Sequence, residues 1–595
     1  MSGAAQIREE QEETDVFTYA DLIVEYLSQL GVDCVFGVPG GAIEPLFNAL
    51  ARSERRGGPR IVVARHEAGA AFMADGYARE NGKIGVCCAT TGPGATNLIT
   101  GVSGAYADNT PMLVITAQTP LPKFGRRALQ DSSCAAIDTV GMFRYCTRYN
   151  SLVSHQEQME HKLISAIMAT RRIPAGPVHI SIPSDVLRAT VSQRPQIRVE
   201  SLMHKFTLSD KEALVGLIRE LAKAERVALF LGDGCAEASE QIMAFAELIN
   251  APFVTGPMGK RWVDETHRLY RGVYGFGGHQ SAKELLEDRD GKLDLVLAVG
   301  AALGELGTSG WAVELMNHKL IHIDYTPEHF TRSPMAKLHV CGYLPSVFQR
   351  LIDEVKEGKF KWGKHWQVFA QPLPRNINGC RVALNDPTGG REEAVILKPQ
   401  RVFTHLSRVL PPGSRFFVDA GNAWAWSIHY YQRPESDGKY HIAMGLGAMA
   451  WSIGAVIGSA LADKERHPHV CVTGDGSYLM SAQEITVALQ QKLPIVFLVL
   501  NDGVLGMVMH GQRLGGAEPS GFELGNVNFA AMARAMGVEG IVVDNPDKLE
   551  ELDFEGFFLK DGPTLIDLRI DPDEVPPMMD RVKGLAKGTS ATPGG

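Results

Sequence analysis

The feature that most constrains the fold is a recurring alternation of short, continuously apolar runs with longer amphipathic stretches. The runs are rich in Val, Ile and Leu and are bounded by Gly and Pro, which is typical of strands buried on both faces by helices. Such strands indicate parallel sheets of the α/β class. We expect strands at 61–64, 84–90, 112–116, 178–182, 227–232, 294–300, 319–324, 415–419, 469–474, 494–501 and 563–570.

Two polar stretches interrupt this alternation, and we interpret both as linkers. Residues 186–206 are irregular, and residues 371–399 are rich in Pro, Gly and Asn. The 595 residues suffice for about three or four domains. The linkers predict three α/β domains, each built on a doubly wound parallel sheet, at 15–188, 205–365 and 395–575.

Composition narrows the class of protein. The net charge is −9, from 59 Lys and Arg against 68 Asp and Glu, which argues against a general nucleic-acid binder. The sequence has no apolar run of membrane-span length and no signal pattern at its start, so we expect no membrane span. The nine cysteines are scattered without zinc spacing, which favours a reduced, cytoplasmic setting. Residues 1–14 and 583–595 are predicted to be flexible tails.

The most informative segment joins two predicted strands through a helix. The first strand runs into GDGS at 474–477, a helix of about four turns follows, and the second strand ends in NDG at 501–503. Asp475 and Asp502 therefore stand just beyond the carboxyl ends of strands, where open α/β sheets bind ligands. Two carboxylates and a diphosphate suit Mg²⁺, and glycines at a helix N-terminus suit a phosphate. Taken alone, GDGS is also a common turn.

This segment resembles the diphosphate and Mg²⁺ motif of thiamine-diphosphate-dependent enzymes, which usually carries Asn at the position of Asp502. The sequences FGVPGGAIEPLFNAL (36–50) and TTGPGATNLITGVSGAYADNTPMLVITAQ (90–118) resemble the first domain of the acetolactate synthases in that family. HIAMGLGAMAWSIGAVIGSAL (441–461) resembles the segment that holds the cofactor bent. The resemblance covers about 15–580 and implies pyrimidine-binding, central and diphosphate-binding domains, in that order.

The resemblance also implies roles for individual residues. Glu67, which opens a helix of small residues, would be the catalytic glutamate at the aminopyrimidine ring; otherwise it merely favours the helix dipole. Gln130 and the backbone of Gly41 would face the substrate, although the glycine also suits a tight turn. Mg²⁺ would be held by Asp475, Asp502 and the carbonyl of Val504. The cofactor would be contacted by Glu67, Gly421, Asn422, Gly447, Met449, Gly476, Ser477 and Asp502, with Met449 as the wedge between its rings.

The family builds each site from two chains, so the resemblance implies a homodimer or homotetramer. Its members act on a 2-keto acid, and the fate of the acyl unit left after loss of CO₂ distinguishes them. Decarboxylases protonate it, often with a His-His pair, and no such dipeptide occurs here. We therefore expect a carboligase that transfers the acyl unit, with pyruvate as the expected donor, to a second carbonyl. The alternative is a decarboxylase or C–C lyase with the same cofactor.

Two further classes receive less support. A non-catalytic member of the family is disfavoured because Glu67, Asp475 and Asp502 are all present. A nucleotide-binding protein could use GDGCAEAS (232–239) as a phosphate loop, but that segment lacks the full glycine pattern and the lysine of such loops.

Departures from the synthases bear on the acceptor. Ala302 and Leu306 stand where the synthases carry two arginines, one of which helps to bind the acceptor carboxylate. The same segment is associated with FAD in the synthases, so the binding of FAD stays open. Gly511 replaces a tryptophan that contacts the acceptor. We expect an acceptor that is larger or less anionic than pyruvate, such as an aldehyde or ketone; Arg126 and Arg127 could instead hold a carboxylate or simply be solvated.

Overall fold

The computed structural model describes residues 16–191, 197–204, 207–287, 293–358, 372–391, 395–433 and 439–579, so both predicted tails lie outside the described residues. The chain forms two compact units. The first comprises residues 1–204 with 457–464, and the second comprises residues 205–456 with 465–595. Within the described ranges, no helix combines the length and the apolar character that crossing a membrane requires.

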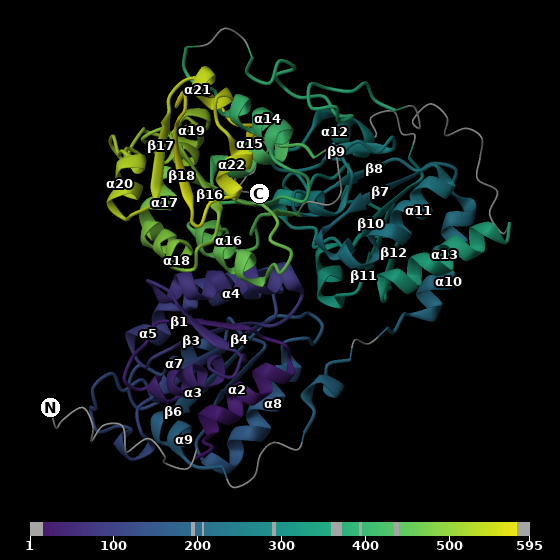
Figure 1. Ribbon diagram of the computed structural model, residues 1–595. Helices are drawn as coiled ribbons and strands as arrows, with labels where there is room; N and C mark the ends of the chain where they lie inside the picture. Colours follow the sequence, from purple (N-terminus) through teal and green to yellow (C-terminus); the bar gives the residue numbers. More distant parts are fainter. Residues whose placement is uncertain are drawn as a thin grey trace, which may run out of the picture. The chain divides into compact units, whose positions relative to one another are not determined.

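The first unit is built on a six-stranded, all-parallel sheet in the order β2-β1-β3-β4-β6-β5. Its strands are β1 (Cys34–Gly37), β2 (Arg60–Val63), β3 (Gly85–Ala89), β4 (Met112–Gln118), β5 (Tyr149–Leu152) and β6 (Pro177–Pro183). Its helices are α2 (Tyr19–Gln29), α3 (Glu44–Glu54), α4 (Glu67–Asn81), α5 (Pro93–Asn97), α6 (Ile99–Ala107), α7 (Thr139–Phe143), α8 (Met159–Ala169) and α9 (Ser184–Arg188). Figure 1 shows α4 on one face of the sheet and α2, α3 and α8 on the other.

Local chemistry explains where α4 begins, ends and packs. The His66 side chain accepts the Ala68 N–H at 3.1 Å and caps the helix start, and Gly82 ends the helix in the left-handed conformation. The small residues of α4 let it lie directly against β3. A Cβ added to Gly85 would stand only 2.0 Å from the carbonyl oxygen of Ala74. Glycine at this position therefore sets the distance between helix and sheet.

The second unit contains two more parallel sheets. The central one has the order β12-β11-β10-β7-β8-β9. Its strands are β7 (Val227–Leu231), β8 (Phe253–Thr255), β9 (Tyr270–Val273), β10 (Leu295–Val299), β11 (Leu320–Asp324) and β12 (Leu338–Cys341), and its helices are α10 (Lys211–Lys223), α11 (Ser239–Ile249), α12 (Gln280–Leu286) and α13 (Leu344–Lys356). Leu217, Phe245 and Phe348, from α10, α11 and α13, share one hydrophobic core on this sheet.

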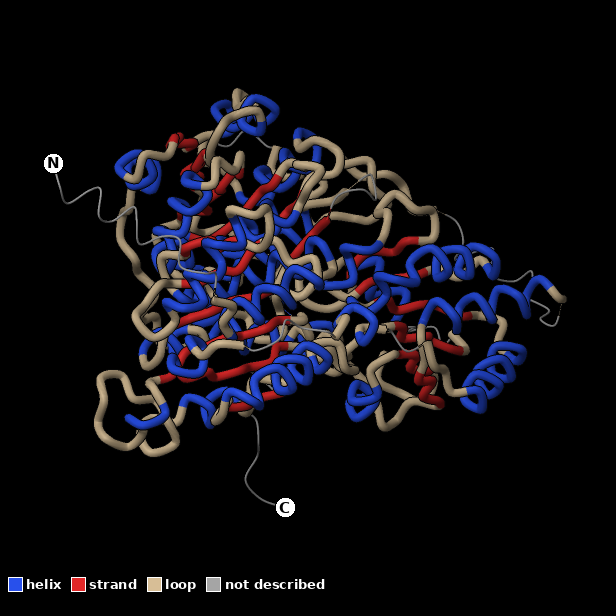
Figure 2. The backbone as a smooth tube through the Cα atoms, turned by 60° about the horizontal axis from the view of Figure 1, so that its bottom comes forward, coloured by secondary structure: helices blue, strands red, loops and turns tan. Residues whose placement is uncertain are grey.

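The last sheet has the order β14-β13-β15-β16-β18-β17. Its strands are β13 (Arg415–Val418), β14 (Lys439–His441), β15 (His469–Gly474), β16 (Ile495–Asn501), β17 (Glu539–Val543) and β18 (Thr564–Arg569). Its helices are α14 (Pro399–Val409), α15 (Asn422–Tyr430), α16 (Trp451–Ala462), α17 (Asp475–Ser481), α18 (Ile485–Gln490), α19 (Gly506–Gly515), α20 (Phe529–Ala535), α21 (Pro546–Glu550) and α22 (Phe554–Phe558). Figure 2 shows strands and helices interleaved through the molecule, as an α/β architecture requires.

The three parallel sheets confirm the predicted doubly wound α/β class, and each of the eleven predicted apolar runs forms a strand. The predicted helix after GDGS is wrong in detail. It begins at Asp475 itself, and a 3-10 turn at Ala482–Glu484 separates α17 from α18. The described part of the polar stretch 371–399 forms neither helix nor strand until α14 starts at Pro399.

Candidate active site

Three loops leave the carboxyl edge of the last sheet side by side. They follow β13, β15 and β16, which are neighbours in the sheet. The register pairs Val418 with Val472 and Gly474 with Leu500, so the chain turns away from the three strands at similar heights. The strand order reverses between β13 and β15, and open α/β sheets bind ligands beside such a reversal.

Asp475 ties two of these loops together. It is the first residue of α17 and is 4% exposed. Its Oδ1 accepts the N–H of Gly476 at 2.7 Å, and its Oδ2 accepts the N–H of Gly503 at 2.8 Å. The carboxylate thus faces the loop after β16.

Asp502 and Val504 lie in that loop. The Val504 N–H donates to Asp502 Oδ1 at 3.2 Å. The loop is held by residues 522–524, because Leu505 N–H donates to the Phe522 carbonyl at 2.7 Å and Leu524 N–H donates to the Gly503 carbonyl at 2.9 Å. These two hydrogen bonds involve Gly503 and Leu505, the neighbours of Val504. The Val504 carbonyl takes part in neither of them.

The two carboxylates are poorly solvated and close together. Burial raises the pKa of Asp475 to about 6. Burial, and then the charge of Asp475, raises the pKa of Asp502 to about 7. A divalent cation reverses this cost, because it favours the charged form of each carboxylate. The pair therefore has the electrostatic character of a site that favours a bound cation.

Asn422 approaches the same place from α15. Its Oδ1 is buried and, among the described residues, has no hydrogen-bond partner. A Cβ added to Gly506 would stand 2.4 Å from Asn422 Nδ2 and 2.9 Å from Asp502 Oδ2. Only glycine at 506 lets these two side chains approach. Gly421, which precedes the helix, has φ +113, a conformation that other residues rarely adopt.

Of the remaining predicted cofactor contacts, Met449 and Ser477 lie at Gly476, and Gly447 lies at α15. A Cβ added there would stand 3.6 Å from Met449 Cε, and Ser477, next in α17, is 1% exposed. Gly447 has φ +71 and lies against the Trp424 ring, because a Cβ added to Gly447 would stand 3.4 Å from the nearest ring atom. The structure therefore brings the predicted residues of the C-terminal sheet together at one edge.

This donor set fits Mg²⁺ and a diphosphate. Two carboxylates and a backbone carbonyl are hard oxygen ligands of the kind that Mg²⁺ prefers, and the side-chain amide of Asn422 has an Nδ2 that can donate to a phosphate oxygen. The described residues contain no group of three or more His, Cys, Asp or Glu that could hold a metal by themselves. The site therefore needs further oxygens, which a bound diphosphate would supply.

The other predicted residues belong to the first unit. Glu67 is the first residue of α4, is 8% exposed, and accepts a hydrogen bond from Asn97 Nδ2 at 2.9 Å. A Cβ added to Gly94 would stand 3.3 Å from its Oε1. Sequence reasoning missed Asn97, although it lies within the segment 90–118 singled out above. Asn97 orients the carboxyl group.

Gly41 and Gln130 follow β1 and β4 of the first sheet. A Cβ added to Gly41 would meet nothing within 4 Å, whereas one on Gly40 would stand 2.6 Å from Thr90 Cβ. Gln130 is exposed, has φ +58, and its carbonyl accepts the Thr91 hydroxyl at 2.9 Å. The loop before Gln130 is thereby fastened to the turn after β3. This fastening was also missed, since it depends on a hydroxyl and a backbone group distant in sequence.

The sequence departs from the synthases at Ala302, Leu306 and Gly511, and the structure shows what the backbone contacts at each position. The Ala302 carbonyl accepts Arg332 Nη1 at 2.9 Å, and the Leu306 carbonyl accepts the Phe276 N–H at 2.7 Å. Gly511 lies in α19, and a Cβ there would meet nothing within 4 Å.

Comparison with known proteins agrees with these features. Three models match the chain: Thiamine pyrophosphate enzyme, N-terminal TPP binding domain at 17–140, central domain at 215–351, and C-terminal TPP binding domain at 419–568. The acetolactate synthase large subunit of Haemophilus influenzae is 30% identical over 576 residues, covering 94% of this chain and 96% of that protein.

Two other relatives give the same picture. The probable acetolactate synthase large subunit of Methanocaldococcus jannaschii is 29% identical over 580 residues (94% of this chain, 93% of that protein). The acetolactate synthase isozyme 2 large subunit of Escherichia coli is 30% identical over 558 residues (93% and 95%). The chain therefore belongs to the thiamine pyrophosphate enzyme family and is an acetolactate-synthase-like enzyme.

Proposed function

We propose that this protein is a carboligase dependent on thiamine diphosphate and Mg²⁺. It decarboxylates a 2-keto acid, with pyruvate as the proposed donor, and joins the acyl unit to a second carbonyl. The observation that carries the proposal is the convergence of Asp475, Asp502 and Asn422 at the carboxyl edge of the last sheet.

In this proposal the last sheet holds the cofactor. Asp475, Asp502 and the Val504 carbonyl bind Mg²⁺, and Asn422 contacts the diphosphate. Gly421, Gly476 and Ser477 offer further diphosphate contacts, while Gly447 and Met449 meet the cofactor rings. When bound, thiamine diphosphate supplies the carbanion-stabilising chemistry that lets a 2-keto acid lose CO₂.

The first unit supplies the proton-handling group. Glu67 holds a proton at the aminopyrimidine ring, and its hydrogen bond from Asn97 fixes the carboxyl orientation. Gln130 and the Gly41 backbone face the substrate. The proposed functional unit is a homo-oligomer in which one subunit provides Glu67 and its partner provides Asp475.

The acceptor is proposed to be an aldehyde or ketone larger or less anionic than pyruvate. Ala302 and Leu306 carry no charge that could bind a carboxylate, and the lack of a side chain at Gly511, where the synthases have a tryptophan, supports a roomier site. All nine cysteines are free thiols, which supports the proposed cytoplasmic setting.

Product analysis tests the proposal directly. The purified protein is incubated with thiamine diphosphate, Mg²⁺ and pyruvate, with and without a panel of aldehydes and ketones, and products are identified by mass spectrometry. We expect CO₂ and a ligated hydroxy ketone. Exclusive formation of acetolactate would contradict the larger acceptor, and CO₂ with only free acetaldehyde would favour the decarboxylase. The flavin absorbance of the same preparation decides whether FAD is bound.

A further inference from the structure

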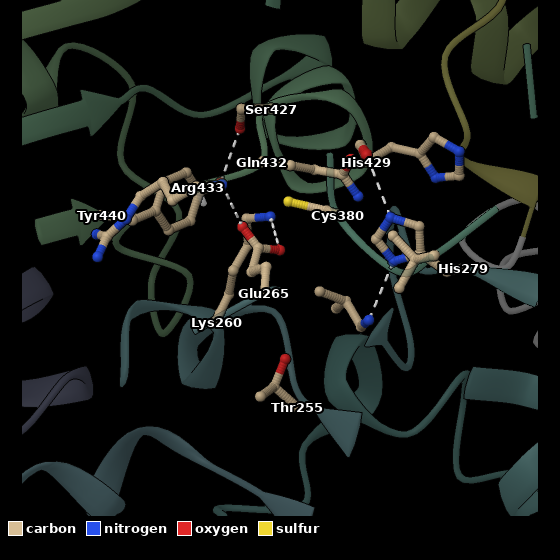
Figure 3. A network of polar contacts seen from close by, with 12 residues as sticks. Thr255, Lys260, Glu265, His279, Cys380, Ser427, His429, Gln432, Arg433 and Tyr440 are labelled. Atoms are coloured by element: carbon tan, nitrogen blue, oxygen red, sulfur yellow. Dashed lines mark hydrogen bonds and ion pairs between the residues drawn. The ribbon is translucent and has the colours of Figure 1, made fainter. Parts of the chain in front are cut away.

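A buried polar cluster surrounds the C-terminal end of α15, the helix whose first residue is Asn422 (Figure 3). Its members come from α15, from the residues just after it, and from segments flanking β9 of the central sheet. All of them lie in the second unit. We call this cluster the clasp, and it consists of Lys260, Glu265, His279, His429 and Arg433.

The two histidines of the clasp are stacked, with ring centroids 4.6 Å apart. His279 Nδ1 accepts the Val273 N–H at 3.0 Å, so Nε2 carries the proton and donates to the His429 carbonyl at 3.1 Å. His429 Nε2 accepts the Asn385 N–H at 2.9 Å, and its Nδ1 donates to the carbonyls of 277–278 at 3.2 Å. Every ring nitrogen is used, which fixes both tautomers.

Both rings are neutral at physiological pH, so this arrangement persists. Burial, the neighbouring ring and the charge of Lys260 lower the pKa of His279 well below 6.5. Burial lowers the pKa of His429 to about 4.

An ion pair completes the clasp. Lys260 Nζ lies 2.6 Å from Glu265 Oε1, and both side chains are 1% exposed. The other oxygen, Oε2, accepts the backbone N–H of Arg433 at 2.8 Å. A buried ion pair is seldom more stabilising than a well-packed apolar pair, but it restricts geometry. Here the Glu265 carboxylate of the ion pair fixes the backbone at Arg433, three residues beyond the end of α15.

The clasp can act at the far end of the helix because α15 is short and rigid. Its nine residues span only about 14 Å. The loop at Gly277 (φ +66) lies directly on it, since a Cβ there would stand 3.0 Å from Ile428 Cβ. At the other end, Asn422 has little freedom beside Gly506. A shift at the clasp is therefore transmitted to Asn422.

We propose that the clasp residues are positioning residues for cofactor binding: they fix α15 along its axis so that Gly421 and Asn422 stand correctly beside Asp502. The inference rests on the proposed function, because it takes Asn422 as a diphosphate contact. None of the clasp residues needs to touch the cofactor.

Two substitutions of one residue test the clasp. His279→Asn places its amide near the position of Nδ1, so it can accept from Val273 but cannot reach His429. His279→Gln reaches the position of Nε2 and can donate to the His429 carbonyl. With Mg²⁺ saturating, we expect the Kd for thiamine diphosphate to rise about tenfold in His279→Asn and to stay within about twofold in His279→Gln.

Binding is followed by quenching of tryptophan fluorescence, since Trp424 and Trp426 lie in α15. A positioning role raises the cofactor KM while kcat at saturating cofactor is largely kept. A purely structural role lowers the thermal midpoint of both variants without separating their affinities, and that result would overturn the inference.

A second pair of variants covers the case in which the histidine variants do not fold. Lys260→Met with Glu265→Gln removes both charges but keeps an acceptor for the Arg433 N–H, whereas Lys260→Met with Glu265→Leu removes that acceptor. We expect weakened cofactor binding only in the second, and equal affinities would contradict the clasp. If the wild-type protein itself does not bind thiamine diphosphate with Mg²⁺, the proposed function fails and the inference falls with it.

Discussion

At the scale of single residues, Asp502 is the informative departure from the family motif. An asparagine there would keep an oxygen ligand and remove one negative charge, whereas an alanine would remove the ligand. We expect Asp502→Asn to bind Mg²⁺ within about threefold of wild type, and Asp502→Ala to lose ten- to a hundredfold, roughly the cost of disturbing a metal site. Calorimetric titration of Mg²⁺ in the presence of thiamine diphosphate measures this.

The matched control is Asp544→Ala. Asp544 is partly exposed, and its Oδ1 accepts from Lys548 Nζ and from Asn545 Nδ2, each at 2.9 Å, so its loss should leave Mg²⁺ binding unchanged. Equal losses in Asp502→Asn and Asp502→Ala would contradict the ligand role of the side-chain oxygen.

The candidate site also shows which residues a sequence can predict. The meeting of Asp475 with the loop that carries Asp502 was predictable, because the carboxyl ends of neighbouring parallel strands lie at one edge of a sheet. Asn97 and Gly506 were not, since one orients a carboxyl group 30 residues away and the other matters only because Asn422 packs against it. Both depend on tertiary contacts that no local pattern records.

At the scale of elements, the sequence predicts the longer strands that helices cover on both faces of a sheet. The apolar runs mark strands such as β4 and β16, which are covered on both faces. Of the unpredicted strands, β5 (YNSL), β14 (KYH) and β17 (EGIVV) stand at the edges of their sheets, whereas β1 (CVFG) and β8 (FVT) are interior and buried but too short to form a marked apolar run. An edge strand is covered less completely, so polar residues break its apolar run.

One glycine tests the contact between α4 and its sheet. Gly85→Ala would place a Cβ 2.0 Å from the Ala74 carbonyl oxygen, and backbone cannot yield as a side chain can. We expect a loss of about 2 kcal/mol or more in the free energy of unfolding, measured by chemical denaturation.

Gly104→Ala is the counterpart in the same unit. It lies inside α6, where a Cβ meets nothing within 4 Å, so alanine should stabilise the protein by about 0.5–1 kcal/mol. If Gly85→Ala and Gly104→Ala changed the free energy of unfolding by similar amounts, the claim that Gly85 sets the distance between α4 and the sheet would be contradicted.

A buried histidine in β6 predicts a pH dependence of stability. His179 is fully buried and bonded to Thr116 and Asn150, and burial lowers its pKa to about 3. Between pH 6.5 and 3 the unfolded chain binds a proton that the folded chain does not, so stability falls as the pH falls. The loss is about 1.4 kcal/mol at pH 5.5, one unit below the unfolded pKa.

The variant His179→Gln isolates this effect, because it cannot titrate. At pH 7.5 the thermal midpoint of the wild-type protein should be higher than that of the variant. At pH 5.5 the two midpoints should lie closer together, because only the wild-type protein loses the contribution of His179. A difference that stays constant between the two pH values would show that His179 is not the group responsible.

At the scale of the whole molecule, the first and last sheets share a topology that the sequence does not reveal. When each set of strands is renumbered from one, both have the order 2-1-3-4-6-5, whereas the central sheet has 3-2-1-4-5-6. In both, candidate residues follow the strands at the reversal: Gly41 in one sheet, Asn422 and Asp475 in the other. Topology is set by non-local pairing, which alternating apolar runs do not specify.

This division of residues between two units leads to the last prediction, which concerns assembly. Glu67→Gln and Asp475→Ala should each inactivate the protein, the first by removing the ring carboxyl group and the second by removing a Mg²⁺ ligand. If each site takes Glu67 from one subunit and Asp475 from its partner, a mixed dimer contains one site with both wild-type residues. The mixed dimers should then show about half of wild-type activity per dimer, since one of their two sites is intact.

The mixture is prepared by co-expression with two affinity tags, and activity is measured on the doubly tagged species. A control mixes Glu67→Gln with a chain carrying both substitutions, in which no site is complete and no activity should appear. Activity that stays absent in the first mixture, with mixed oligomers shown by native mass spectrometry, would place Glu67 and Asp475 of one site in the same chain. Recovery would establish that the catalytic glutamate and the metal site meet only when two copies of the chain assemble.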